Sequence, residues 1–209
     1  MNKKTIGLFY NLGFDTLFGY VKGFDHKNFT QDGDLIIFYD EENEFVGFNL
    51  LNASKKITSF LYNGINSDNV PLIAELGSVL KLKSGLWEQY NQEPQFLVGE
   101  INSCVHHPNS DKLSICQVNT GEKIEQIVCG APNCDQDQKV VVATIAAIMP
   151  NLMKIVPSEL RGEQSNGMLC SERELGIASD NLVKGLLILD QQQYHTGNSF
   201  WKEYYNEQN

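Results

Sequence analysis

The chain has 209 residues and a formal net charge of −10, with 26 Asp and Glu side chains against 16 Lys and Arg. Domains usually hold about 100–150 residues, so this length allows two small domains. The acidic balance argues against a protein that holds nucleic acid by its overall charge. No apolar run approaches the roughly 18 residues of a membrane span, and no charged leader precedes an apolar segment, so we expect a cytoplasmic protein without a membrane partner.

The first half of the chain contains short apolar and aromatic runs, which are typical of strands. Four such runs occupy residues 5–12, 16–23, 34–39 and 45–50. The acidic turn 40–44 predicts that the last two form a hairpin. Helical spacing follows over 70–80, where Pro71 can occupy the first turn after a cap at Asp68 or Asn69. We therefore predict a small α+β domain over residues 1–89.

The second half changes rhythm to closely spaced strand-like runs separated by turn residues. These runs occupy residues 96–104, 113–118, 124–129, 139–148 and 153–160. The spacing is typical of a small β-sandwich or barrel, and it does not choose between the two. Ser171 and Glu174 form a capping-box pattern, which predicts a short helix that Gly176 can end. We predict a mainly β domain over residues 90–199, followed by a C-terminal tail over 200–209.

Five cysteines make metal binding worth testing against the known spacings of zinc ligands. They are Cys104, Cys116, Cys129, Cys134 and Cys170. Cys129 and Cys134 are close in sequence, but a second close pair, as zinc sites usually have, is missing. His106 and His107 are adjacent, so on a strand they point to opposite faces. We expect reduced thiols packed as small hydrophobic side chains, with no metal and no cofactor.

The sequence offers no arrangement that predicts catalysis. Asp111 lies near His107, but turn formation around Pro108 explains both residues. Residues 162–167 contain glycines without the Lys that a nucleotide-binding loop requires. We therefore expect no enzymatic activity and no small-molecule substrate.

Several short blocks of residues in the second half stand at set distances from one another, and together they resemble a known family. They are His107–Leu113 (HPNSDKL), Ile127–Asn133 (IVCGAPN), Lys154–Ile155, Leu160–Gly162 and Ser165–Ser171 (SNGMLCS). From about Phe96 to Asp190 the chain resembles the tRNA-binding domain of bacterial phenylalanyl-tRNA synthetase β subunits, which also occurs in stand-alone bacterial proteins. Ser110 stands where family members usually carry Ala. The resemblance implies an OB-fold, a five-stranded barrel that binds ligands on its strand 2–3 face and adjoining loops.

The resemblance also implies a set of residues that contact tRNA. An arginine such as Arg161 can donate to a phosphate through two N–H groups or stack on a base, and a serine hydroxyl can meet a phosphate or sugar. The predicted contact residues are Arg161, Lys154, Ser165, Lys112, Asn109 and Asn166. Two alternatives stay open at this point. Arg161 could instead form an ion pair with Glu159, Glu163 or Glu172, and Asn166 could satisfy a turn backbone.

The leading prediction is a non-catalytic protein that recognises tRNA by shape, and a homodimer could present two such faces. Between Val98 and Asp190 there are 7 Lys and Arg against 12 Asp and Glu residues, which predicts weak and salt-sensitive binding. The alternative is a protein-interaction or chaperone-like module that retains the fold with weak or no RNA binding. An RNA-directed hydrolase or transferase would need His106 or His107 as acid or base, and we expect no turnover.

Overall fold

The computed structural model describes residues 4–21, 26–83, 85–90, 93–177 and 184–206. The chain forms two compact units, and both are mainly β. One unit comprises Met1–Pro94 with Ala147–Lys154, and the other comprises Gln95–Ala146 with Ile155–Asn209. The predicted domain limits at residues 89/90 and 199/200 do not coincide with these boundaries, and they stay predictions.

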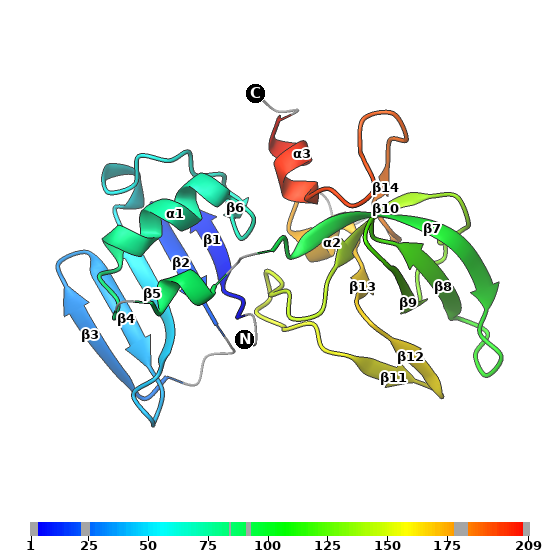
Figure 1. Cartoon of the computed structure of the whole chain (residues 1–209), viewed down its shortest axis with the longest axis horizontal. Helices are drawn as coiled ribbons and strands as arrows, with labels where there is room; N and C mark the ends of the chain where they lie inside the picture. Colours follow the sequence, from blue (N-terminus) through cyan, green and yellow to red (C-terminus); the bar gives the residue numbers. More distant parts are fainter. Residues whose placement is uncertain (1–3, 22–25, 84, 91–92, 178–183, 207–209) are drawn as a thin grey trace. The chain divides into compact units, whose positions relative to one another are not determined.

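The first unit is built on a six-stranded antiparallel sheet in the order β3-β4-β5-β2-β1-β6 (Figure 1). Its strands are β1 (Gly7–Asn11), β2 (Thr16–Tyr20), β3 (Asn28–Asp32), β4 (Leu35–Tyr39), β5 (Phe45–Leu51) and β6 (Gly64–Ile65). Two 3₁₀ turns, η1 (Ala53–Lys55) and η2 (Trp87–Gln89), complete it together with helix α1 (Val70–Val79). The β4–β5 hairpin and the other predicted strands are confirmed, except that part of 16–23 lies outside the described residues.

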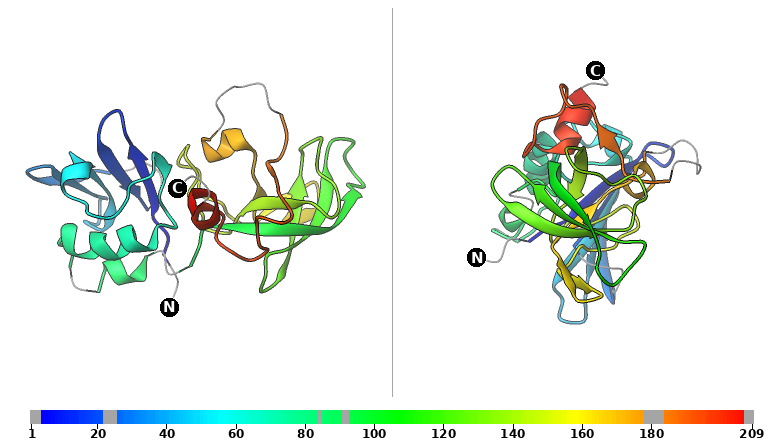
Figure 2. Two further views of the ribbon diagram at one scale, coloured as in Figure 1. Left: turned by 90° about the horizontal axis from the view of Figure 1, so that it is seen from above. Right: turned by 90° about the vertical axis from the view of Figure 1, so that its right-hand side faces the viewer.

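Helix α1 lies across one face of this sheet (Figures 1 and 2). Its Leu72 and Leu76 are fully buried with Leu8, Leu17 and Phe48 from the strands, because the period of the helix and the alternation of the strands both direct apolar side chains inward. The Asn69 side chain accepts the Leu72 N–H, and Pro71 occupies the first turn, as the sequence predicted. Strand β3 was not predicted, since all five of its residues are exposed and no apolar alternation marks it.

The second unit contains an antiparallel sheet in the order β13-β10-β7-β8-β9, with β14 beside β10 and a separate hairpin of β11 and β12 (Figure 1). Its elements are β7 (Phe96–His106), β8 (Ser114–Asn119), β9 (Ile124–Cys129), β10 (Lys139–Ala143), β11 (Ser158–Leu160), β12 (Glu163–Ser165), β13 (Met168–Leu169), α2 (Glu172–Leu175), β14 (Ile188–Leu189) and α3 (Phe200–Asn206). Within the described residues, no ladder pairs β9 with β13, so closure of the sheet into a barrel is not observed. The Asn166 N–H donates to the Gln126 carbonyl (2.9 Å) near this open side.

Two predicted strands of the second half are shorter in the structure. The run 139–148 ends as a strand at Ala143, and 153–160 keeps only Ser158–Leu160. Ala146 has a φ angle of 74°, which a strand does not accommodate, and Leu152, immediately before the second run, has a φ angle of 69°. Apolar content alone therefore overestimated these strands. The α2 capping box is confirmed, with the Ser171 hydroxyl accepting the Glu174 N–H and Gly176 ending the helix at a φ of 73°.

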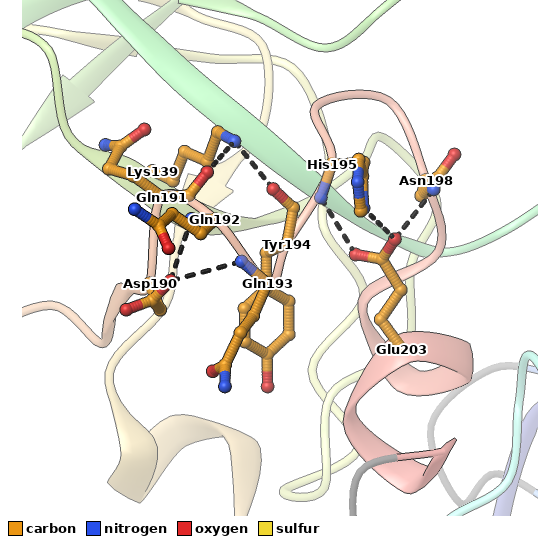
Figure 3. A network of polar contacts seen from close by, with 9 residues as sticks. All are labelled: Lys139, Asp190, Gln191, Gln192, Gln193, Tyr194, His195, Asn198 and Glu203. Carbon is orange, nitrogen blue, oxygen red and sulfur yellow. Dashed lines mark hydrogen bonds and ion pairs between the residues drawn. The ribbon is translucent and has the colours of Figure 1, made fainter.

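Helix α3 packs against β7, where the Trp201 and Phe96 rings lie 6.0 Å apart, centroid to centroid. The segment leading into α3 is held by polar side chains (Figure 3). The Lys139 ammonium donates to the carbonyls of Gln191 (2.8 Å) and Tyr194 (2.6 Å). The Asp190 carboxylate accepts hydrogen bonds from the backbone N–H groups of Gln192 and Gln193. The Glu203 carboxylate accepts hydrogen bonds from His195 and Asn198. The ammonium group of Lys139 is thus bound by two carbonyls of the second unit.

None of the helices in the described parts of the chain is long and apolar enough to cross a membrane.

Candidate nucleic-acid interface

A buried histidine joins the loop 107–113, between β7 and β8, to the β11–β12 hairpin. The His107 side chain is buried, and its Nδ1 accepts the Asn109 N–H at 3.0 Å. Since Nδ1 acts as an acceptor, the proton of the neutral ring is on Nε2, which donates to the Leu160 carbonyl at 3.1 Å. The His107 N–H also donates to the Leu113 carbonyl (2.9 Å), which closes the loop. This positioning role was not predicted, because Leu160 is far away in sequence.

The hairpin turn presents Arg161 at the surface beside this loop. Arg161 and Gly162 have φ angles of 52° and 96°, the double positive φ of a tight hairpin turn. The Arg161 Nη1 donates to the Asn109 carbonyl (2.9 Å), and the Asn109 side-chain amide donates back to the Arg161 carbonyl (3.4 Å). Both residues are exposed, so the other guanidinium N–H groups face solvent. Two of the six predicted contact residues are thus brought together.

The alternative interpretation of Arg161 as an ion-pair partner is not seen in the structure. Across the described residues, the ion pairs do not include Arg161 with Glu159, Glu163 or Glu172. The first two carboxylates accept from glutamine amides instead: Gln164 donates to Glu159 (3.0 Å) and Gln126 donates to Glu163 (3.3 Å). These acids still flank the arginine, so the surface around it is not strongly basic.

Ser165 and Asn166 fasten the hairpin to strand β9. The Ser165 hydroxyl is buried, accepts the Val128 N–H at 3.1 Å and donates to the Gly167 carbonyl at 3.4 Å. The Asn166 N–H donates to Gln126, whose own side-chain amide donates to the Gln164 carbonyl (3.0 Å). The Ser165 hydroxyl therefore uses its hydrogen bonds within the fold, and these contacts position the hairpin.

The two predicted lysines lie in different places. Lys112 is exposed and lines a shallow pocket with His106, Asp111, Pro132 and Cys134. Lys154 is also exposed, but it belongs to the segment Ala147–Lys154 of the first unit, where it forms a β-bridge with Ile148. The structure of the second unit therefore groups Asn109, Lys112 and Arg161 around the loop 107–113, without Lys154.

The structure brings together cysteines that their sequence spacing keeps apart. The sulfurs of Cys104, Cys116 and Cys134 all lie within 4.8 Å of one another, and a set of this kind can hold a metal ion. Sequence spacing did not predict this set, because the three residues come from two strands and a loop.

Comparison with known proteins identifies the family to which the chain belongs. Residues 96–193 match a family model described as "Putative tRNA binding domain". The chain is 42% identical over 179 residues to the "Putative tRNA-binding protein YtpR" of Bacillus subtilis (strain 168), a match that covers 84% of this chain and 88% of that protein.

Other similarities cover smaller parts of this chain. The phenylalanine–tRNA ligase β subunit of Dickeya dadantii (strain 3937) is 54% identical over 86 residues, which are 41% of this chain and only 11% of that subunit. A solved structure of a MetRS related protein from Pyrococcus horikoshii is 19% identical, with a TM-score of 0.38, and the match covers 51% of this chain and 89% of that one. The chain therefore belongs to the family of the Bacillus subtilis protein YtpR and carries a tRNA-binding domain similar to that of phenylalanine–tRNA ligase β subunits.

Proposed function

We propose that this protein binds tRNA without catalysing a reaction on it, through the loop 107–113 and the β11–β12 hairpin of an OB-type domain. The observation that carries the proposal is the placement of Arg161. Its guanidinium is held at the turn by the Asn109 carbonyl, while its other donors point to solvent. A side chain ordered before binding loses less conformational entropy when it meets a phosphate.

The composition of this surface favours recognition of shape over tight electrostatic attraction. Arg161 and Lys112 supply positive charge, and Asn109 supplies an amide that can reach a sugar or base edge. Phosphate contacts of this kind would position the RNA, while sugar and base contacts would discriminate it. Ser165 and Asn166 act in the proposal by holding the hairpin, and Lys154 is a further contact only if tRNA extends to the first unit.

The experiment that tests this site compares two substitutions of exposed arginines in the full chain. Arg161→Asn removes the guanidinium and leaves an Asn-Gly turn, which suits the observed positive φ angles. Arg173→Gln on α2 removes the same charge outside the proposed face and keeps a good helix former. Binding of fluorescent tRNA is followed by anisotropy over a salt series.

We expect Arg161→Asn to weaken tRNA binding and to reduce the slope of log K against log salt by about 0.7–0.9, the value for one lost phosphate contact. Arg173→Gln should leave both quantities close to those of the unsubstituted protein. Equal effects of the two substitutions would contradict the assigned face, because they would show that only total charge matters.

The net charge of −10 favours a second candidate function, a protein-interaction or chaperone-like module that retains this fold. Absence of tRNA binding by the unsubstituted protein at low salt would favour this candidate. A homodimer, which would add avidity to a weak site, remains a prediction for light scattering.

A further inference from the structure

Three strand and loop cysteines of the second unit direct their sulfurs to one point. The Sγ–Sγ distances are 3.3 Å between Cys116 and Cys134, 3.7 Å between Cys104 and Cys134, and 3.9 Å between Cys104 and Cys116. Cys116 is fully buried, whereas Cys104 and Cys134 are half-buried. Cys134 also lines the pocket that it shares with Lys112 and His106, so the cluster has an opening to the surface.

A β-bulge places Cys104 in this cluster. The register between β7 and β8 shifts at Asn102, so Ile101 pairs with Val118 and Cys104 pairs with Cys116. If the register of Ile101 with Val118 continued without the bulge, Ser103 would face Cys116, and Cys104 would point to the other side of the sheet. Bulges often redirect a side chain in this way next to functional sites.

Cys129 lies at the end of β9 and does not belong to this set of three sulfurs. Its Sγ accepts the Ala131 N–H at 3.4 Å, so this thiol has a hydrogen-bond partner in its own loop. The candidate ligands are therefore the three thiols of Cys104, Cys116 and Cys134. Zn²⁺ with three protein ligands takes water in its fourth position.

The observed separations match a tetrahedral thiolate site. Zinc–sulfur bonds are about 2.3 Å long, so two sulfurs of a tetrahedron lie about 3.8 Å apart. The three measured distances fall on both sides of this value. A disulfide between Cys116 and Cys134 would need the sulfurs to approach to about 2.05 Å and would leave the Cys104 thiol without a role.

We propose that Cys104, Cys116 and Cys134 bind one Zn²⁺, with water in the fourth position. Binding replaces three thiol protons, which go to solvent, by three zinc–sulfur bonds, with no change of oxidation state. The resulting site carries one negative charge, and Lys112 beside the pocket partly offsets it. The ion would tie the loop after β9 to strands β7 and β8, next to the loop 107–113.

The test uses the full chain, reduced and freed of metal, and titrates it with Zn²⁺ against a chromophoric chelator and separately with Co²⁺. We expect one Zn²⁺ per chain, and with Co²⁺ we expect the thiolate charge-transfer band and visible bands of a tetrahedral site. No stoichiometric Zn²⁺ binding, or Co²⁺ spectra without a thiolate band, would overturn the proposal.

Single substitutions then assign the ligands. Cys134→Ser and Cys104→Ser should each weaken Zn²⁺ binding by at least about tenfold, since even outer-sphere partners contribute that much. Cys170→Ala is the matched control, because Cys170 is fully buried and lies outside the cluster. The same loss in Cys170→Ala would overturn the assignment, and unchanged affinity in Cys104→Ser would overturn the three-sulfur set. Circular dichroism establishes that each variant is folded, and the test does not depend on tRNA binding.

Discussion

At the residue scale, His107 connects two loops that together present the proposed contact residues. Its ring is buried and uses both nitrogens, so it behaves as a structural cross-link between the backbone N–H of Asn109 and the Leu160 carbonyl. Arg161 and Asn109 add a reciprocal pair of hydrogen bonds outside it. The exposed pair is therefore supported by a buried polar group, which keeps it in one arrangement.

Because His107→Ala leaves the Asn109 N–H and the Leu160 carbonyl without a partner, we expect it to lower the free energy of unfolding by about 2–4 kcal/mol. His106→Ala is the control, since His106 is exposed and its loss should cost no more than about 0.5 kcal/mol. Urea unfolding followed by tryptophan fluorescence measures both. Similar losses for the two neighbours would contradict the cross-link.

At the element scale, the backbone geometry of the β11–β12 turn does not depend on the guanidinium of Arg161. The positive φ of Arg161 is unusual for a residue with a Cβ, and Asn adopts it more readily. Arg161→Asn loses one surface hydrogen bond and gains a better turn residue. We expect its free energy of unfolding to stay within about 0.5 kcal/mol of the unsubstituted value. Destabilisation well beyond this, measured by urea unfolding, would mean that the guanidinium serves the fold.

A second element-scale prediction concerns helix α1 and the segment before it. Burial opposes ionisation of Glu75, but hydrogen bonds from the amides and hydroxyls of Thr58 and Ser59 outweigh it and lower the pKa of Glu75 to about 2. A lowered pKa stabilises the fold above the ordinary value of 4.5, and this contribution is lost as the pH falls from 4.5 towards 2.

We therefore expect the melting temperature to fall between pH 4.5 and 2, and Glu75→Gln to flatten this dependence while lowering stability at neutral pH. Trp87, whose Nε1 donates to the Ile73 carbonyl on α1, reports the transition by fluorescence. Glu42→Gln, at an exposed turn position, is the control and should keep the pH dependence. An unchanged pH profile in Glu75→Gln would refute the assignment.

The strands that the sequence predicted well are short apolar and aromatic runs bounded by turn residues. β1, β4, β5 and β9 are such runs, and the α2 capping box is also a local signal. The bulge at Asn102 breaks the alternation of β7, so the pairing of Cys104 with Cys116 could not be derived from spacing. The contacts of His107 with Leu160 and of Ser165 with Val128 depend on tertiary structure for the same reason.

At the scale of the whole molecule, net charge and family membership favour different functions. The chain belongs to the family of the Bacillus subtilis protein YtpR and matches the family model of a tRNA-binding domain, yet it carries a net charge of −10, so any RNA contact has to come from a few well-placed groups. In our proposal these groups are Arg161, Lys112 and Asn109, and the carboxylates of Glu159 and Glu163 flank Arg161 in the sequence. A site of this composition should bind weakly and lose affinity steeply as salt rises.

The decisive measurement is the binding of bulk tRNA to the unsubstituted full chain across a salt series, followed by fluorescence anisotropy. We expect saturable binding at low salt, with log K falling linearly as log salt increases and a slope that corresponds to a small number of phosphate contacts. No binding at the lowest salt, or binding that does not change with salt, would refute the proposed tRNA site.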